Sequence, residues 1–434
     1  MRADGSSKYQ EKWGYFPSVG AAWNISEEDF MKDQKWVDYM KIRASWGKLG
    51  NDKIKASDGF ASIKQEMGTS GVFGGSVVPG YTNLVYFSWL GWEVVNETNV
   101  GLDFRTLNSR LTLEADWYYR LTQNAVINAP LPMGAGNLLG NNGEILNTGV
   151  ELSLNWSDKI GKDFSYFIGA NLTTLHNEVK DLNGLSYLYG GTAEFRTISK
   201  VGGELNAYYG HEIAGVYQNE AEIAADPIAV ANDLKPGDFK YVDQNQDGKI
   251  DDKDRVTLGS YIPNFTYGIN LGFSYKNFDF SMVMQGVTGN QIVNRKRGDR
   301  RWHSELNYDA DQVENRWTGE GSTNSYMSAA GSVNPWNIAK FNSFYVEDGS
   351  YFRIQNVQVA YTFPKKDFGK FKMPSVRLSL TADRPLTIFK ANSFSPELGG
   401  VKNEDGTMPS SSYGFDERVY PLSSAYTLGL RIIY

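Results

Sequence analysis

Residues 265–275 read Phe-Thr-Tyr-Gly-Ile-Asn-Leu-Gly-Phe-Ser-Tyr, and this stretch decides the fold. Its odd-numbered residues are all aromatic or aliphatic, and its even-numbered residues are all small or polar. Side chains of a β-strand point alternately to opposite faces, so this pattern predicts a strand with one apolar and one polar face. The length matches the roughly 9–11 residues with which a tilted strand crosses a bilayer.

The same alternation recurs along the chain. Val150, Leu152, Leu154 and Trp156 are separated by Glu151, Ser153 and Asn155, and the stretches 111–121 and 376–381 follow the same rule. Taken together, the segments predict eleven strands, at about 13–25, 37–49, 97–104, 111–121, 146–156, 164–177, 265–274, 278–287, 351–363, 375–386 and 424–434.

The connections between these strands alternate in length. Short connections follow the odd-numbered strands, and the long ones, which follow the even-numbered strands, lie at about 50–96, 122–145, 178–262, 288–350 and 387–423. Short turns at one end and long loops at the other are typical of outer-membrane barrels, whose turns are periplasmic and whose loops are extracellular. A soluble sandwich or propeller has no reason to place every long connection at one end, and loops beyond about 15 residues are uncommon in compact domains.

The amino-acid composition excludes several classes of function. The 434 residues carry 43 Lys+Arg against 50 Asp+Glu, a formal charge of -7, which argues against nucleic-acid binding. The absence of Cys removes disulfides, thiol catalysis and thiolate metal sites. No apolar run approaches the roughly 20 residues of a membrane-spanning helix, which excludes helical membrane proteins. Residues 1–7 have no apolar segment, so we expect no signal peptide there.

The alternation also assigns charges to one face. Charge on the lipid face of a barrel strand is costly, so we expect the charged members of the strands to point into the lumen. These residues are Glu114, Asp116, Arg120, Glu151, Arg377 and Asp383. Aromatic residues near strand ends, such as Tyr361 and Phe363, are typical of the aromatic girdles at the membrane interface.

The last ten residues alternate to the end of the sequence. A terminal strand with aromatic residues and an interior glycine is similar to the carboxy-terminal signal of outer-membrane barrel assembly. Its members here are Tyr426, Gly429, Ile432 and Tyr434.

Six segments carry a resemblance to a known family. They are Arg-Ala-Asp-Gly-Ser-Ser at 2–7, Trp-Gly-Tyr-Phe-Pro-Ser-Val at 13–19, Ile-Arg-Ala-Ser-Trp-Gly-Lys-Leu-Gly-Asn at 42–51, Gly-Asp-Phe-Lys-Tyr-Val-Asp-Gln-Asn-Gln-Asp-Gly-Lys-Ile-Asp at 237–251, Glu-Asp-Gly-Ser-Tyr-Phe-Arg-Ile-Gln-Asn-Val at 347–357, and Tyr-Thr-Leu-Gly-Leu at 426–430. In this order they resemble the C-terminal part of the SusC/RagA family of TonB-dependent outer-membrane transporters.

The resemblance implies more than the residues do. Members of this family look like twenty-two-stranded barrels with an N-terminal plug, on which the TonB complex acts. A SusD-like surface lipoprotein captures a glycan or peptide above the barrel. We therefore expect residues 1–434 to be the C-terminal half of such a barrel in the outer membrane of a Gram-negative cell, without the signal peptide and plug. The expected role is nutrient import, not catalysis.

A twelve-residue stretch at 243–254 fits an EF-hand-type calcium loop. Its side-chain oxygens fall at the ligand positions, Lys249 offers a carbonyl, and Gly248 occupies the position of the sharp turn. The predicted calcium ligands are Asp243, Asn245, Asp247, Lys249, Asp251 and Asp254. An acidic turn without an ion remains the alternative, because no helix pair flanks the loop and position 12 is Asp where Glu is usual.

Other candidate sites are weaker. Aromatic residues in the long loops could stack on sugar rings or hold the loops together. They are Trp89, Trp92, Trp302, Trp317 and Trp336, with Tyr208, Tyr209 and Tyr326. The three His residues have no metal-ligand spacing, and the sequence has no nucleophile elbow or phosphate-binding loop. We therefore predict no catalytic residues.

Two interpretations stay open from sequence. The first is an import receptor whose Val150, Leu152, Leu154 and Trp156 face lipid. The second is a secreted calcium-binding β-protein that binds or degrades carbohydrate, in which these residues face a protein core. The loop pattern and the aromatic terminus favour the first.

Overall fold

The computed structural model describes residues 2–3, 13–51, 62–87, 90–130, 137–192, 194–299, 309–368, 371–399, 410–416 and 419–433. The chain divides into two compact units. Unit 1 comprises residues 1–154, 173–188 and 200–205, and unit 2 comprises 155–172, 189–199 and 206–434. No helix in the described parts of the chain is long and apolar enough to span a membrane.

The main sheet confirms the predicted strands. Its hydrogen-bonded path contains eleven strands in sequence order, from β3 to β27, and each predicted segment has a counterpart on it. The path runs through β3 (Ser18–Asn24), β4 (Tyr39–Asn51), β7 (Glu93–Thr106), β8 (Leu111–Pro130), β9 (Asn137–Ile160), β10 (Phe164–Thr174), β18 (Phe265–Tyr275), β19 (Phe278–Thr288), β22 (Tyr351–Phe363), β25 (Ser375–Phe389) and β27 (Ala425–Ile433).

Several predicted boundaries were wrong, and the predicted connection 50–96 contains two strands, β5 (Ser62–Phe73) and β6 (Ser76–Phe87). The first predicted strand, 13–25, is split into β2 (Trp13–Gly14) and β3, because Pro17 has no N–H to donate to a sheet. The connection predicted at 122–145 is much shorter, since β8 continues to Pro130 and β9 begins at Asn137. Residues 125–127, Ala-Val-Ile, continue the β-favouring composition of the strand beyond the predicted end.

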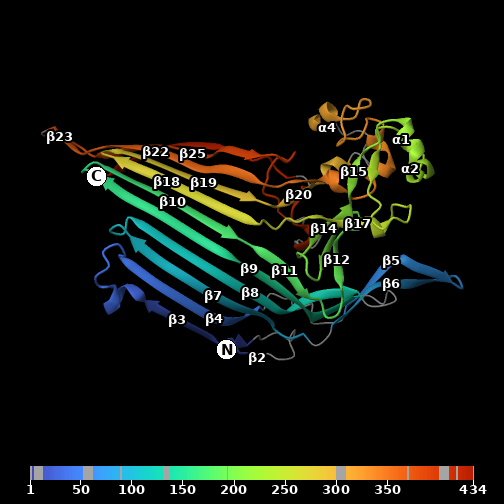
Figure 1. The fold of residues 1–434 in the computed structure, drawn as a ribbon, viewed down its shortest axis with the longest axis horizontal. Coiled ribbons are helices and arrows are strands. Elements are labelled where there is room, and N and C mark those ends of the chain that lie inside the picture. Colours follow the sequence, from blue (N-terminus) through green and yellow to red (C-terminus); the bar gives the residue numbers. More distant parts are fainter. Residues whose placement is uncertain are drawn as a thin grey trace. The chain divides into compact units, whose positions relative to one another are not determined.

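Unit 1 is mostly long antiparallel hairpins (Figure 1). Besides the path strands it holds β5 (Ser62–Phe73) and β6 (Ser76–Phe87), joined by a turn at Gly74 and Gly75 with φ of 56° and 81°. Both values lie in the left-handed region that glycine tolerates, as a two-residue hairpin turn requires. Strand β11 (His176–Asp181) pairs with β9 alongside the main path.

Charged residues in unit 1 gather on one face of the sheet. Arg43 contacts Asp116 at 2.5 Å and Asp103 at 3.2 Å, and Arg120 contacts Glu97 at 3.1 Å. Glu114 is opposite Asp103 in register, which places it on the same face, and Glu151 alternates with Val150. The apolar residues between them, including Ile42, Val100, Trp117 and Val150, are exposed on the other face.

The sheet of unit 2 repeats this division. On β25, Leu378, Leu380, Leu386 and Ile388 are 41%, 54%, 44% and 56% exposed. The alternate residues bond across strands: Arg377 pairs with Asp279 on β19, two strands away, and Asp383 accepts a hydrogen bond from Asn356 on β22. All six charged residues predicted for the lumen therefore lie on the polar face of their strands.

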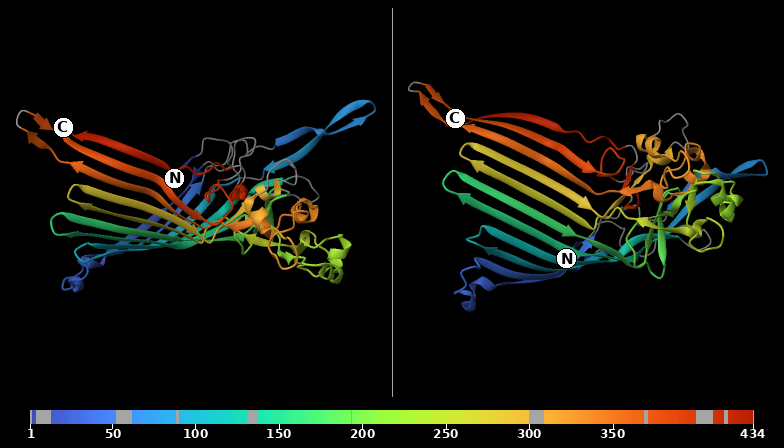
Figure 2. Two further views of the ribbon diagram at one scale, coloured as in Figure 1. Left: turned by 90° about the horizontal axis from the view of Figure 1, so that it is seen from above. Right: turned by 45° about the horizontal axis from the view of Figure 1, so that its top comes forward.

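Figure 2 shows β18, β19, β22 and β25 side by side, with a folded body at one end. At the other end, β18 and β19 are joined by a tight turn, and β22 and β25 are joined by a small hairpin of β23 (Lys366–Phe368) and β24 (Phe371–Met373). We call this body, formed by the described parts of 189–199, 206–264, 289–350 and 390–416, the loop body. The predicted long connections 178–262 and 288–350 thus contain secondary structure of their own.

The loop body consists of small sheets and short helices. Its elements are β12 (Tyr187–Gly191), β13 (Arg196–Lys200), β14 (Ala207–His211), β15 (Ile213–Val216), α1 (Glu220–Ala225), α2 (Pro227–Ala231), β16 (Phe239–Tyr241), the 3₁₀ helix η5 (Asp252–Asp254), β17 (Arg255–Gly259), β20 (Gln291–Asn294), α3 (Lys296–Asp299), α4 (Ala310–Asn315), α5 (Pro335–Ile338), the 3₁₀ helix η7 (Ser343–Tyr345), β21 (Val346–Asp348) and β26 (Phe415–Asp416).

The loop body has its own apolar core. One cluster contains Tyr208 and Tyr345, which are 0% and 2% exposed, and a second contains Phe239 and Tyr241, at 0% and 5%. Burial of large apolar side chains is the main stabilising contribution to a fold, so these connections behave as a folded domain.

Candidate functional site

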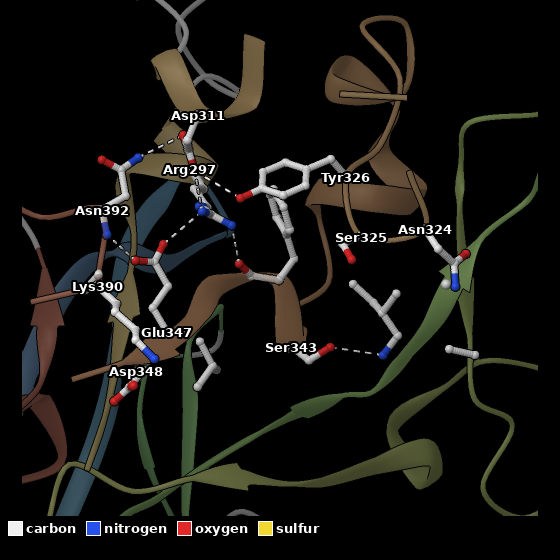
Figure 3. Close-up of a pocket in the computed structure, with 16 residues that line it drawn as sticks. Arg297, Asp311, Asn324, Ser325, Tyr326, Ser343, Glu347, Asp348, Lys390 and Asn392 are labelled. Carbon is white, nitrogen blue, oxygen red and sulfur yellow. Dashed lines mark hydrogen bonds and ion pairs between the residues drawn. The ribbon is translucent and has the colours of Figure 1, made fainter. Parts of the chain in front are cut away.

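A pocket of about 860 Å³ opens in the loop body of unit 2 (Figure 3). Its walls come from β15, α3, α4, η7, β21 and the segment 390–392. Ten of its lining residues are polar or charged: Arg297, Asp311, Asn324, Ser325, Tyr326, Ser343, Glu347, Asp348, Lys390 and Asn392.

Arg297 organises one wall of the pocket. Its guanidinium Nη2 contacts Asp311 at 2.7 Å and Glu347 at 3.0 Å, and Nη1 donates to the carbonyl of Phe344 at 2.9 Å. The guanidinium carbon also lies 4.2 Å from the centroid of the Phe344 ring. Only 8% of the side chain is exposed, so this ion-pair network is largely removed from water. A buried guanidinium needs such partners to offset the loss of its hydration.

The two carboxylates are further fixed by amides. Asn392 donates its side-chain N–H to Asp311 at 2.9 Å and its backbone N–H to Glu347 at 2.5 Å. Asn294 donates to Glu347 at 3.0 Å. These contacts join α3, α4, β21 and the segment after β25, so Arg297 connects parts of the chain that are far apart in sequence.

The remaining polar groups stand around the pocket opening. Ser343 and Asn324 accept hydrogen bonds from the N–H groups of Ile213 and Val216, on the edge of β15. Figure 3 shows Lys390 and Asp348 together at the opposite wall. The hydroxyl and amide of Ser350, with help from Lys390, lower the pKa of Asp348, which keeps it ionised. Because Arg297 is neutralised by its own carboxylates, this pocket suits a polar ligand held by hydrogen bonds.

The predicted calcium loop forms a closed turn between β16 and β17. Asp243 accepts hydrogen bonds from the N–H groups of Asp247 and Gly248, at 3.3 and 2.8 Å, and Asn245 accepts one from Asp247 at 3.1 Å. Gly248 has φ of 78°, the conformation that the sixth position of such a loop requires. Among the described residues, no three acidic or His side chains converge as metal ligands.

Asp254, the last predicted ligand, is fully buried. Its carboxylate accepts the N–H of Asp251 at 2.7 Å and that of Gln244 at 3.0 Å, which closes the turn and caps η5. His211 lies behind it, with Nε2 at 2.9 Å from the carbonyl oxygen of Asp251. Burial lowers the pKa of His211. Asp254 therefore has a structural hydrogen-bonding role in addition to its predicted role as a ligand.

The aromatic candidates do not converge on one site. Trp92 is 8% exposed and packs against Phe16, with ring centroids 5.4 Å apart. Trp317 and Trp336 pack against the core around Phe239, and Trp336 donates its indole N–H to the carbonyl of Phe239 at 2.8 Å. Of the aromatic candidates within the described residues, only Tyr326 lines the pocket.

The other predicted residues are placed as follows. Tyr208 is buried and Tyr209 contacts Tyr189. Tyr426 and Ile432 are exposed on β27, which also contains Gly429, and the assembly signal stays a prediction. Trp89, Trp302 and Tyr434 lie outside the described residues.

Sequence reasoning missed the Arg297 network. Arg297 stands in the basic run Arg295-Lys296-Arg297, which has the appearance of a solvated loop. Its partners Asp311 and Glu347 are 14 and 50 residues away, at positions that no local motif connects. No signal in the sequence could have found this network.

The fold and its two-faced strands define the class: a segment of a transmembrane β-barrel of the outer membrane. A family model described as "TonB dependent receptor-like, beta-barrel" matches residues 2–383, and the chain belongs to this family. The resemblance to SusC/RagA transporters is confirmed by relatives in the same group.

Three relatives illustrate the match. TonB-dependent receptor P26 of Formosa agariphila is 30% identical over 458 residues, which cover 100% of this chain and 44% of that protein. TonB-dependent receptor SusC of Bacteroides thetaiotaomicron is 26% identical, over 100% of this chain and 41% of that protein. The RagAB peptide importer in an open-open state has the same fold, with a TM-score of 0.75 at 22% identity over 99% of this chain and 44% of that one. The chain thus spans less than half the length of these relatives.

Proposed function

We propose that the protein to which this chain belongs imports a nutrient, a glycan or peptide, across the outer membrane. TonB supplies the energy, and a SusD-like lipoprotein captures the substrate at the surface. The observation that carries this proposal is the two-faced sheet of a family member: exposed Leu378, Leu380 and Ile388 suit lipid, and paired charges such as Arg377 and Asp279 suit a polar interior. The relatives SusC and the RagAB peptide importer support the import role.

The partner is proposed to contact the loop body. In a barrel of this topology the long connections are extracellular, and here they form a body with its own core that offers a fixed surface. The ion pairs around Arg297 support this role. A docking surface binds more tightly when its side chains and loops are already ordered before the partner binds.

Import is tested in cells that carry the complete receptor. Uptake of labelled oligosaccharides and peptides is measured in the wild type, in a receptor deletion and in a strain without TonB. We expect one substrate class to enter only when both receptor and TonB are present. Co-purification of an outer-membrane lipoprotein with the tagged receptor tests the partner. Equal uptake of every substrate in all three strains would contradict the proposal.

We also propose that residues 243–254 bind one calcium ion. The loop brings Asp243, Asp247, Asp251 and Asp254 into twelve residues, and a divalent cation would relieve their repulsion. The turn at Gly248 supports this arrangement. Calorimetry on the complete receptor tests the site by comparing the wild type with an Asp243→Ala, Asp247→Ala double variant. Equal calcium uptake by both proteins would show that the loop is only a turn.

A further inference from the structure

A second pocket, of about 570 Å³, lies on the polar face of the sheet in unit 2. It extends over β9, β10, β18, β19 and the first residue of β22, and its lining contains no charged residue. Its hydrogen-bonding side chains on the polar face of the sheet are Asn155, Asn171, Thr266, Asn270, Gln285 and Tyr351. Strand register places Thr266, Asn270 and Gln285 on one face, because Asn270 lies opposite Val283 and Gly268 lies opposite Gln285. Tyr351 lies on the same face, because it is opposite Val287, which is two residues from Gln285.

Glycines make room for these amides. A Cβ atom on Gly169 would lie 2.2 Å from Oδ1 of Asn270 and 2.6 Å from Oδ1 of Asn155. A Cβ on Gly268 would lie 2.7 Å from Oδ1 of Asn171. The carboxamides therefore lie over bare backbone, in two rows across the strands. The first row is Asn155, Gly169 and Asn270, and the second is Asn171, Gly268 and Gln285.

The charged groups beside the pocket are already paired. Arg353 is 2% exposed and contacts Glu397 at 2.7 Å. Glu397 also accepts hydrogen bonds from Tyr351 at 2.8 Å and Gln285 at 3.4 Å. A charged ligand would lose hydration in this pocket without gaining an ion pair from the lining, which is unfavourable.

An amide lining suits hydroxyl groups. Each carboxamide donates and accepts hydrogen bonds, as each hydroxyl does, so pairs form in either direction without any charge. Aromatic rings border the rows: Tyr351 at one side, and Phe167, which is 41% exposed and shares its face with Gly169. Ring faces of this kind pack against the apolar surface of a ligand.

We propose that the two amide rows bind an uncharged, hydroxyl-rich ligand, a neutral oligosaccharide, on the inner face of the barrel. This inference rests on the proposed import function and names the substrate class. A peptide is the weaker candidate, because its termini and charged side chains find no charged partner in the lining.

The test uses the complete receptor purified in detergent. An array of neutral, uronate and sulfated oligosaccharides, together with a peptide library, is used to find its ligands, and calorimetry gives their affinities. We compare the wild type with an Asn171→Ala, Asn270→Ala double variant. Gly169→Ala serves as a second variant that removes no hydrogen-bonding group but displaces Asn155 and Asn270. Gln358→Ala is the control, because it removes an amide from the same face outside the pocket.

We expect neutral oligosaccharides to bind, and both pocket variants to weaken binding by about tenfold or more, the equivalent of two lost hydrogen bonds. The control keeps the wild-type affinity. Unchanged affinity in both variants overturns the proposal. This includes the case in which the variants lower only the melting temperature, because the two amide rows would then serve packing against the rest of the receptor. Binding of peptides or anionic glycans alone also overturns it, but leaves the import function intact. A receptor without TonB-dependent uptake would instead refute the import function.

Discussion

The sheet of unit 2 and the loop body distribute apolar side chains in opposite ways. On β25 in the sheet, Leu380 and Ile388 are 54% and 56% exposed. In the loop body, Phe239 and Tyr208 are both 0% exposed. Exposed apolar rows of this kind on a soluble protein would mark an interaction surface or an aggregation hazard. The difference shows that the two regions are built for different solvents, lipid for one face of the sheet and water for the loop body.

Polar groups follow the same contrast. In the sheet they lie on one face and bond across strands, as Arg377 does with Asp279. In the loop body some of them are buried and hydrogen-bonded in place: Asn342, 0% exposed, donates to Tyr241, Asn337 and Lys340, and accepts from Phe344. The sheet therefore depends on alternation along each strand, and the loop body depends on specific contacts between distant residues.

The largest effect is expected in the core of the loop body. Phe239→Ala should destabilise this body by about 3–5 kcal/mol, because it removes a fully buried ring and leaves a cavity. Limited proteolysis of the receptor in detergent should then cleave the loop body while the barrel stays intact. Tyr420→Ala, at a site 90% exposed, is the control and should leave cleavage unchanged. Equal protection of both variants would mean that the loop body has no core of its own.

A charge on the lipid face gives the next effect. Leu380→Arg should lower barrel stability by about 2–4 kcal/mol, because Leu380 lies near the middle of β25 on the apolar face. Thr381→Arg, one residue further on and on the polar face, should cost much less. Unfolding in urea from lipid vesicles measures both. A larger loss for Thr381→Arg would reverse the assignment of the two faces.

The buried amide network is expected to contribute less than the apolar core. Asn342→Ala should destabilise the loop body by about 1–3 kcal/mol, because it removes the acceptor of the Phe344 N–H and a donor to the carbonyls of Asn337 and Lys340. Hydrogen exchange of residues 335–345 is the measurement. Asn232→Ala, at an exposed position, should change stability by less than about 0.5 kcal/mol. Similar effects of the two substitutions would refute a specific role for the network.

The smallest effect concerns pH. Burial opposes ionisation of Asp252, but Arg255 at 2.9 Å and Arg196 at 3.4 Å lower its pKa overall. Because the pKa of Asp252 is lower in the folded state, its ionised carboxylate stabilises the fold at pH values above the unfolded-state pKa of about 3.9. This contribution is lost as the pH falls through the folded-state pKa. Protease protection of the loop body should therefore decrease slightly below about pH 4. In Asp252→Asn this part of the acid dependence should vanish, and its persistence would assign it to another group.

The contrast also explains what the sequence could predict. Alternation is a local pattern, so residues 265–275 and 375–386 indicated their strands and their faces directly, and all eleven path strands were found. The first strand was predicted too long because Pro17 interrupts a pattern that otherwise continues. The inner structure of the loop body was not predicted, because its core joins residues such as Phe195, Tyr208 and Phe415, which no short-range pattern connects.

For the functional residues, too, the sequence could predict only what a local pattern shows. The calcium loop at 243–254 was visible because its donors follow one another along the chain. The Arg297 network and the amide rows were not, since each depends on residues that only strand register or loop packing brings together. Asn171 and Asn270 have no distinguishing context in the sequence. Their relation appears only once β10 and β18 are neighbours in the sheet, where Asn171 lies over Gly268 and Asn270 lies over Gly169.

The central claim is that one face of this sheet lies against lipid, and site-directed spin labelling of β25 tests it most directly. These 434 residues contain no Cys, so single cysteines can be placed at 378, 379, 380 and 381 in the complete receptor, in lipid vesicles, with any Cys elsewhere in the receptor replaced. Collision with oxygen reports lipid exposure, and collision with a water-soluble nickel complex reports exposure to water. We predict high oxygen accessibility at 378 and 380 and high nickel accessibility at 379 and 381. Uniform accessibility to nickel, or an alternation in the opposite phase, would contradict the account.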